Sequence, residues 1–233
     1  SELKSEIYNP VPEIEDTGTY GIRASFETGT IECFKYDTYT TQCAEYYITN
    51  DVPANTGRNS CYVSNRTMQD VTVMIRLDDA VMDSKVKMSC YVRADEGISE
   101  QPFYFKLRLS STNGISYIKA PGSAVVSYGD WVLMSSEVDF SQYDLIEAPW
   151  IFVQTDKSNA VSGGNTTSSY YIDDLLITSD CDGMFYDDMN YTPTEKGEDI
   201  SDTAENYTPQ NIPIEQNIDS LKDVFKDYFK MGI

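Results

Sequence analysis

Between residues 26 and 178 the chain consists of short apolar stretches in which apolar and polar residues alternate, separated by clusters of Gly, Asn, Asp and Ser. A period of two places alternate side chains on opposite faces of a β-strand. The alternation is clearest in KVKMSCYVRA and FYFKLRL. The side chains expected to point inward are Val86, Met88, Cys90 and Val92 in the first stretch, and Phe103, Phe105, Leu107 and Leu109 in the second. Each strand should therefore bury one face and leave the other wet.

Further stretches with strand character are separated by turn-rich segments such as SSTNGIS and SNAVSGGNTTS. They are VTVMIRL from Val71, WVLMSSEV from Trp131, WIFVQT from Trp150 and YYIDDLLIT from Tyr170. Many short antiparallel strands without intervening helices are typical of a sandwich. We therefore expect an all-β fold, a jelly-roll β-sandwich over residues 25–181, preceded by an N-terminal extension over residues 1–24.

The character of the chain changes after this region. Residues 182–216 are acidic, contain Pro and Thr, and follow neither period, so they are expected to form a linker. Residues 217–233 predict one C-terminal amphipathic helix, with an apolar stripe that includes Leu221, Phe225 and Phe229. An exposed stripe of this kind is expected to pack on the chain's own sandwich or on a neighbouring chain.

The charge balance narrows the range of partners. Lys and Arg number 17 against 38 Asp and Glu, and 17 − 38 gives a net charge of −21. Such a surface repels phosphate backbones, so nucleic acid and anionic membranes are not expected partners. No apolar run approaches the roughly 18 residues that a membrane helix needs.

The chain contains no histidine, which excludes Ser-His-Asp and Cys-His catalysis and the usual catalytic zinc sites. Its five cysteines show no metal-ligand spacing. Cys33 and Cys43 could form a disulfide that crosslinks a hairpin, the predicted staple. Cys90 instead follows the strand alternation, as expected of a small side chain packed in the core.

Two ordered sets of motifs resemble known families. The tail IPIEQNIDSLKDVFKDYFKMGI resembles the start of glycoside hydrolase family 10 xylanase domains. Residues 26–178 resemble a family 22 carbohydrate-binding module, a β-sandwich that commonly precedes such domains. The motifs that carry this second resemblance are FETG, SNRT, MSCYVRA, ISYIKA, GDWVLM, IFVQTD and YYIDDLLI, in that order.

The family 22 resemblance implies a glycan-binding site. In such modules aromatic rings stack on sugars, while carboxylate, amide or guanidinium groups bridge vicinal hydroxyls. The family's xylan-binding residues include a tyrosine on one strand, which matches Tyr117 in this sequence. They also include a Tyr-x-Glu pair on another strand, whose positions are occupied here by Phe152 and Gln154. The family's tryptophan falls at or near Asp70, which cannot stack. The family's early arginine falls near Lys35 or Tyr36, and Arg66 in the SNRT motif completes the candidate binding residues.

The same resemblance implies a structural calcium ion where the beginning and end of the module meet. The matching side chains are Glu27 and Asp173, with backbone carbonyls completing six or more ligands. The alternative is that Asp173 and Asp174 simply alternate between a wet face and a turn.

These features favour a non-catalytic carbohydrate-binding module that targets a secreted modular endo-1,4-β-xylanase to plant cell-wall xylan or mixed-linkage β-glucan. The Phe152 and Gln154 replacements are expected to weaken binding. An extracellular or cell-surface location follows, and the catalytic residues are expected to lie beyond Ile233. The alternative is a structural module that packs against the catalytic barrel without binding sugar. An independent glycan-degrading enzyme has little support from the sequence.

Overall fold

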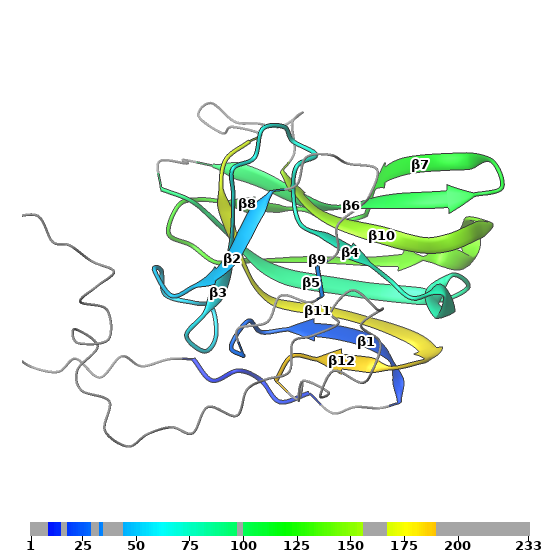
Figure 1. Cartoon of the computed structure of the whole chain (residues 1–233), viewed down its shortest axis with the longest axis horizontal. Helices are drawn as coiled ribbons and strands as arrows, with labels where there is room; N and C mark the ends of the chain where they lie inside the picture. Colours follow the sequence, from blue (N-terminus) through cyan, green and yellow to red (C-terminus); the bar gives the residue numbers. More distant parts are fainter. Residues whose placement is uncertain are drawn as a thin grey trace, which may run out of the picture. The chain divides into compact units, whose positions relative to one another are not determined.

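The computed structural model describes residues 9–14, 18–28, 33–34, 44–96, 100–155 and 167–189. Strands dominate these residues and form two sheets stacked face to face (Figure 1), which confirms the all-β sandwich. The seven-stranded sheet A comprises β1 (Thr19–Ala24), β2 (Glu45–Thr49), β3 (Ser60–Ser64), β5 (Lys85–Ala94), β9 (Val132–Asp139), β11 (Tyr170–Asp182) and β12 (Phe185–Asp187). The five-stranded sheet B comprises β4 (Met74–Arg76), β6 (Gln101–Ser111), β7 (Gly114–Lys119), β8 (Ala124–Val126) and β10 (Leu145–Thr155). Two single-turn 3-10 helices, η1 (Asp79–Val81) and η2 (Phe140–Gln142), connect strands.

The long strand β11 organises sheet A. One of its sides pairs with β5, while the other pairs first with β3 and then with β1. Strands β2 and β9 extend the sheet from β3 and β5 respectively. Sheet B follows the order β4-β10-β6-β7, with β8 also on β6. The pairings are antiparallel apart from β1 with β12.

The core lies between the two sheets, and the alternation predicts its members correctly. The inward side chains of β5 and β6 are all at most 1 % exposed, as are Ile151 and Val153 from β10 and Ile172 and Ile177 from β11. Cys90 is one of these core side chains, and burial raises the pKa of its thiol well above the usual value. Cys43, the partner in the predicted staple, lies outside the described residues.

The sandwich extends beyond the predicted boundaries at both ends. Strand β1 lies in the predicted N-terminal extension, and β12 lies in the predicted linker, where it pairs in parallel with β1. The linker prediction rested on acidic composition, but two of the acids it counted, Asp187 and Asp188, are 7 % and 0 % exposed. A carboxylate can be buried when the fold supplies it with hydrogen-bond donors, and composition cannot show this.

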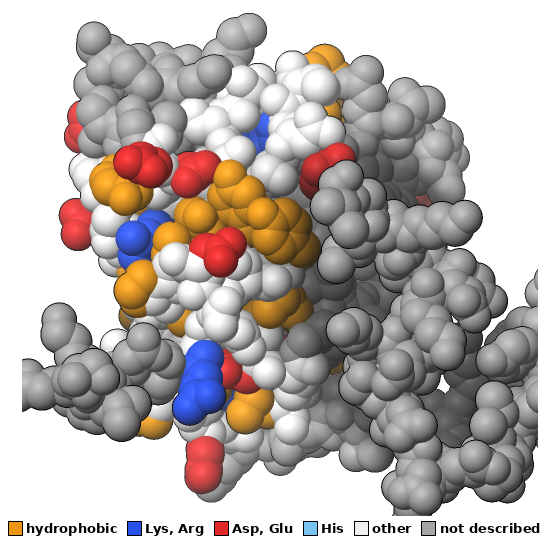
Figure 2. Space-filling view, turned by 60° about the vertical axis from the view of Figure 1, so that its left-hand side comes forward, with side chains coloured by type: hydrophobic (Ala, Val, Ile, Leu, Met, Phe, Trp, Pro, Cys, Tyr) orange, Lys and Arg blue, Asp and Glu red, His pale blue; other side chains and the backbone are white. Residues whose placement is uncertain are grey.

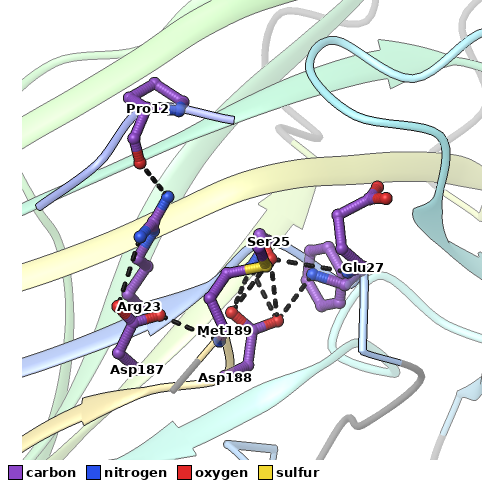
Figure 3. A network of polar contacts seen from close by, with 8 residues as sticks. Pro12, Arg23, Ser25, Glu27, Asp187, Asp188 and Met189 are labelled. Atoms are coloured by element: carbon purple, nitrogen blue, oxygen red, sulfur yellow. Dashed lines mark hydrogen bonds and ion pairs between the residues drawn. The ribbon is translucent and has the colours of Figure 1, made fainter. Parts of the chain in front are cut away.

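A buried polar network holds β12 against β1 (Figure 3). Asp187 forms an ion pair of 3.2 Å with Arg23, whose guanidinium also donates to the carbonyl of Pro12. The carboxylate of Asp188 accepts hydrogen bonds from the backbone amides of Ser25 and Phe26, at 2.9 and 2.8 Å, and from the Ser25 hydroxyl. The side chains of Arg23 and Asp187 are 8 % and 4 % exposed, so this pair belongs to the interior.

Residues 190–233, including most of the predicted linker and the predicted C-terminal helix, lie outside the described residues. Within the described parts of the chain, no helix has the length and apolar character needed to cross a bilayer.

Candidate functional site

The outer face of sheet B collects most of the predicted sugar-binding side chains. Because side chains alternate along a strand, the even-numbered residues of β6 and β10 face outward while their odd-numbered neighbours fill the core. The pairing register sets Tyr117 of β7 opposite Arg108 of β6, and Phe152 of β10 opposite Lys106. Gln154 in turn lies opposite Tyr104. Residues from distant parts of the sequence therefore share one surface.

Tyr117 is the exposed aromatic member of this face, with 54 % of its surface accessible. The amino group of Lys106 lies over its ring, 5.1 Å from the centroid. Lys119 makes a similar contact with the ring of Tyr104, at 4.6 Å. These cation–π contacts hold flexible lysine side chains against the aromatic rings.

Gln154 and Phe152 lie beneath this surface, at 0 % and 6 % exposure. The Gln154 side chain accepts a hydrogen bond of 3.1 Å from the Tyr104 hydroxyl and donates one to Asp70 Oδ1. Gln154 is thus a link between two other side chains, and it holds them in fixed positions.

Asp70 supplies a carboxylate at this point of the surface. Its Oδ1 accepts hydrogen bonds from Gln154 and from Lys106 Nζ, the latter at 2.7 Å, while its side chain remains 63 % exposed. Partial burial raises the pKa of this carboxyl, but the hydrogen bonds from Lys106 and Gln154 and the charges of Lys106 and Arg66 outweigh that effect and lower it. Asp70 is therefore ionised at neutral pH.

The position of Asp70 changes the effect expected from two departures from the family pattern, Asp70 in place of a tryptophan and Gln154 in place of a glutamate. Gln154 stands where the family pattern has a glutamate, so the sequence indicates a lost carboxylate. In the structure, the carboxylate of Asp70 is hydrogen-bonded to Gln154. A charged acceptor is therefore present at the site, contributed by a loop instead of a strand.

Arg66 is placed below the face and not on it. It is 6 % exposed, and it donates to the carbonyls of Val71, Ser168 and Gln69 and to the hydroxyl of Thr155. Its guanidinium also lies 5.0 Å from the centroid of the Tyr170 ring. Arg66 thus ties the loop that carries Gln69 and Asp70 to the sandwich. Lys35, the other predicted cationic contact, lies outside the described residues.

Sequence reasoning assigned no role to three members of this face, Gln69, Lys106 and Lys119. Gln69 donates to the carbonyl of Thr155 at 2.6 Å and to the Tyr104 hydroxyl at 3.4 Å. Tyr104, Lys106 and Lys119 line the surface beside it. The alternation in FYFKLRL does place Tyr104 and Lys106 on the wet face, but only the pairing of β6 with β7 and β10 brings them beside Tyr117.

The two predicted calcium ligands, Glu27 in the turn after β1 and Asp173 in β11, both meet one loop, residues 55–59. Glu27 Oε1 accepts hydrogen bonds of 2.7 Å from the amides of Arg58 and Asn59. Asp173 Oδ2 accepts from the amides of Asn55 and Thr56 at 2.7 and 3.2 Å. The loop fits tightly, because a side chain on Gly57 would come within 2.3 Å of the Glu27 carboxyl carbon.

A bulge in β11 turns a second carboxylate toward this loop. Asp174 adopts a φ of 47°, and its carboxylate accepts hydrogen bonds of 2.7 and 2.6 Å from the side chains of Asn55 and Thr56. Burial and, after it, the neighbouring charge of Asp174 raise the pKa of Asp173 to about 8, although hydrogen bonds from the amides of Asp174, Thr56 and Asn55 act in the opposite direction. The all-oxygen chemistry of these groups fits calcium. Among the described residues, however, no cluster of three or more His, Cys, Asp or Glu side chains could hold a metal ion.

Comparisons with known proteins identify solved structures that have a similar fold. No protein-family model matches the chain, and no curated protein matches it. Among solved structures, the C-terminal family 22 carbohydrate-binding module of Clostridium thermocellum Xyn10B matches with a TM-score of 0.58 and 21 % identity, over 72 % of this chain and 98 % of that one. The CBM22-1 xylan-binding domain of Paenibacillus barcinonensis Xyn10C matches with a TM-score of 0.55 and 18 % identity, over 67 % and 92 % of the two chains. The chain therefore has the fold of family 22 carbohydrate-binding modules.

Proposed function

We propose that this chain is a non-catalytic carbohydrate-binding module that holds a secreted xylanase on plant cell-wall polysaccharide, either xylan or mixed-linkage β-glucan. The observation that carries the proposal is the exposed ring of Tyr117 beside the ionised carboxylate of Asp70. Both lie on the outer face of a sandwich whose fold is that of xylan-binding modules. Attachment of the module raises the effective concentration of the joined enzyme at its substrate.

The glycan would be bound in two ways, by stacking on the Tyr117 ring and by hydrogen bonds to the polar side chains around Asp70. Tyr117 offers an apolar face to a sugar ring, while Asp70 Oδ2 and the Lys106 amino group offer an acceptor and a donor for hydroxyls. Gln154, Tyr104 and Arg66 act as positioning residues, because each is buried. Gln154 bonds Asp70 directly, Tyr104 bonds Gln154, and Arg66 fixes the loop that carries Asp70. Phe152 gives the face an apolar base.

The proposal is tested by calorimetric titration with xylohexaose and with a mixed-linkage gluco-oligosaccharide. Saturable heat with either ligand supports the binding module. Absence of heat with both, in a folded protein, would overturn the proposal and favour the structural module instead. The same protein should release no reducing sugar from xylan.

Asp70→Asn is expected to weaken glycan binding about fivefold. A hydrogen bond to a charged group is worth roughly 1 kcal/mol more than a neutral one, and that difference corresponds to this factor in affinity. The measurement is the dissociation constant by calorimetry. Asp83→Asn, which changes an exposed aspartate on the loop before β5, is the matched control and should leave binding unchanged. Equal affinity in Asp70→Asn and the parent protein would remove Asp70 from the site.

We also propose that Glu27 and Asp173 hold a calcium ion, with Asp174 and backbone carbonyls of the 55–59 loop close by. The support is the burial of Asp173 next to a second carboxylate. In the part of the chain that the structure describes, none of these three carboxylates pairs with a Lys or Arg. Calcium would supply the missing positive charge and join the loop to β11.

Chelation is therefore expected to lower the thermal midpoint by roughly 5–10 °C. Calcium at a hundred times its dissociation constant stabilises the folded state by about 2.7 kcal/mol, and each kcal/mol moves the midpoint of a domain of this size by about 2–4 °C. The measurement is thermal unfolding in excess EGTA and in millimolar calcium. Asp173→Asn should abolish the difference, whereas Asp83→Asn should keep it. Identical midpoints of the parent protein in both buffers would contradict the site.

A further inference from the structure

A second group of aromatic side chains lies on the outer face of sheet A, away from sheet B. Tyr47 of β2 pairs with Tyr62 of β3, and Tyr62 pairs with Tyr171 of β11, so that the three rings form one row across neighbouring strands. We call Tyr47, Tyr62 and Tyr171 the tyrosine row. Figure 2, which brings the β2 and β3 end of Figure 1 forward, shows hydrophobic side chains gathered on one surface with acidic side chains around them.

The rings contact one another in sequence. The centroids of Tyr47 and Tyr62 are 5.5 Å apart, and those of Tyr62 and Tyr171 are 4.6 Å apart. Exposure decreases along the row, from 48 % for Tyr47 at the edge of the sheet, through the half-buried Tyr62, to 8 % for Tyr171. The ring planes are turned by 66° and then by 39°. Tyr47 and Tyr62 therefore present a twisted aromatic surface, and Tyr171 supports it.

Polar groups that could meet hydroxyls border the row. Asp95 accepts a hydrogen bond of 2.7 Å from the Tyr62 hydroxyl and a second from the amide of Glu96, which leaves acceptor capacity on its carboxylate. Burial and the hydrogen bond to Asp95 together raise the pKa of Tyr62 to about 12. The phenol thus stays protonated and continues to donate to Asp95.

Arg93 supplies the complementary donor. It pairs with Tyr171 across β5 and β11, so its side chain continues the line of the row. Its Nε is buried and has no hydrogen-bond partner among the described residues. Arg93 as a whole is only half-buried, so its other guanidinium N–H groups are the donors available to a ligand oxygen.

The loop between β2 and β3 forms a boundary beside the row. Its Pro53 carbonyl accepts a hydrogen bond of 2.9 Å from the indole nitrogen of Trp131, which directly precedes β9. Asp51 in the same loop and Asp95 both act electrostatically on Tyr171. The row therefore has one carboxylate nearby in this loop, Asp51, and a second after β5, Asp95.

We propose that the tyrosine row, together with Arg93 and Asp95, is a second glycan-binding site that takes a single, neutral β-linked polysaccharide chain. Rings with an adjacent carboxylate and guanidinium match the apolar faces and vicinal hydroxyls of pyranoses. The two carboxylates, in a chain of net charge −21, disfavour nucleic acid and polyuronates. A purely apolar protein partner would cover the half-buried Arg93 and Asp95 side chains without offering them hydrogen bonds. The turned ring planes suit a twisted single chain better than a flat crystalline surface.

A site on each sheet would make the module bivalent. A long polysaccharide could then be held at two points, or two chains could be held by one module, which raises avidity without new contacts. Short oligosaccharides cannot reach both faces at once. They should therefore report the two sites separately.

The test is the stoichiometry of xylotetraose and cellotetraose binding by calorimetry, with the full chain and two single variants. The expected result is two sites in the parent protein and one site in either Tyr47→Ala or Tyr117→Ala. Ile146→Ala, which removes another exposed apolar side chain, should keep both sites. If Tyr47→Ala lowers the thermal midpoint by more than a few degrees, Arg93→Gln replaces it as the deciding variant.

The outcomes separate this inference from the proposed function. One site that is lost in Tyr117→Ala and unchanged in Tyr47→Ala and Arg93→Gln overturns the second site and leaves the sheet B site standing. One site that is lost in Tyr47→Ala but unchanged in Tyr117→Ala supports the tyrosine row and removes the sheet B site. Absence of binding to both oligosaccharides, in a folded protein, overturns both.

Discussion

Tyr117→Ala is expected to weaken xylohexaose binding at the sheet B face by roughly thirtyfold. The ring is 54 % exposed, and a tyrosine ring covered by a sugar removes on the order of 80 Å² of apolar surface from water, worth about 2 kcal/mol at about 25 cal/mol per Å². A change of that size corresponds to roughly thirtyfold in the dissociation constant. Because the side chain projects from the outer face of sheet B, folding should be unaffected.

The measurement is calorimetry of the two proteins under the same conditions, with thermal unfolding as the check on folding. Tyr117→Phe is the matched control. It keeps the ring and removes only the hydroxyl, so it should retain most of the affinity. A dissociation constant for Tyr117→Ala within twofold of the parent value would show that the ring makes no contact with the glycan.

Asp187→Leu is expected to destabilise the sandwich by about 3–5 kcal/mol, because it leaves the buried guanidinium of Arg23 without its carboxylate partner. For a domain of this size the thermal midpoint should fall by roughly 10 °C. The destabilisation is expected to come from the unpaired charge of Arg23 and not from the loss of Asp187 itself. The double variant Arg23→Met with Asp187→Leu removes both charges and should recover most of the loss.

Chemical denaturation of the two single variants and the double variant measures these differences. Asp83→Leu, which changes an exposed aspartate on the loop before β5, serves as the control for adding a leucine. If Asp187→Leu unfolds at the parent denaturant concentration, β12 does not belong to the cooperative unit of the sandwich. The result thus also decides where the folded module ends.

The exchange of roles between Asp70 and Gln154 bears on how substitutions in this fold should be interpreted. Compared with the family pattern, an aromatic residue gives way to Asp70 and a glutamate to Gln154, and each change read singly indicates weaker binding. The hydrogen bond between the two side chains joins the changes into one rearrangement. The stacking ring is lost, but the charged acceptor is kept. We therefore expect affinity to be reduced and not abolished.

The strand pattern by itself determined the fold class and the core. In Lys85–Ala94 and Gln101–Ser111 the side chains alternate with a period of two, and burial follows that period because a strand places neighbours on opposite faces. The same rule put Tyr117 and Tyr104 on strands of the sandwich. These inferences need only the local geometry of an extended backbone, which depends on the residues of each strand alone.

Only the tertiary structure decided what each polar side chain does. Arg66, Asp187 and Asp188 resemble surface charges in the sequence, yet the fold surrounds them with partners and buries them. Asp70 meets Gln154 across 84 positions of sequence, and Tyr62 meets Tyr47 and Tyr171 from two other strands. Strand pairing and loop packing set these contacts. They depend on which segments of the whole chain are brought together, and no local pattern in a single sequence records that information.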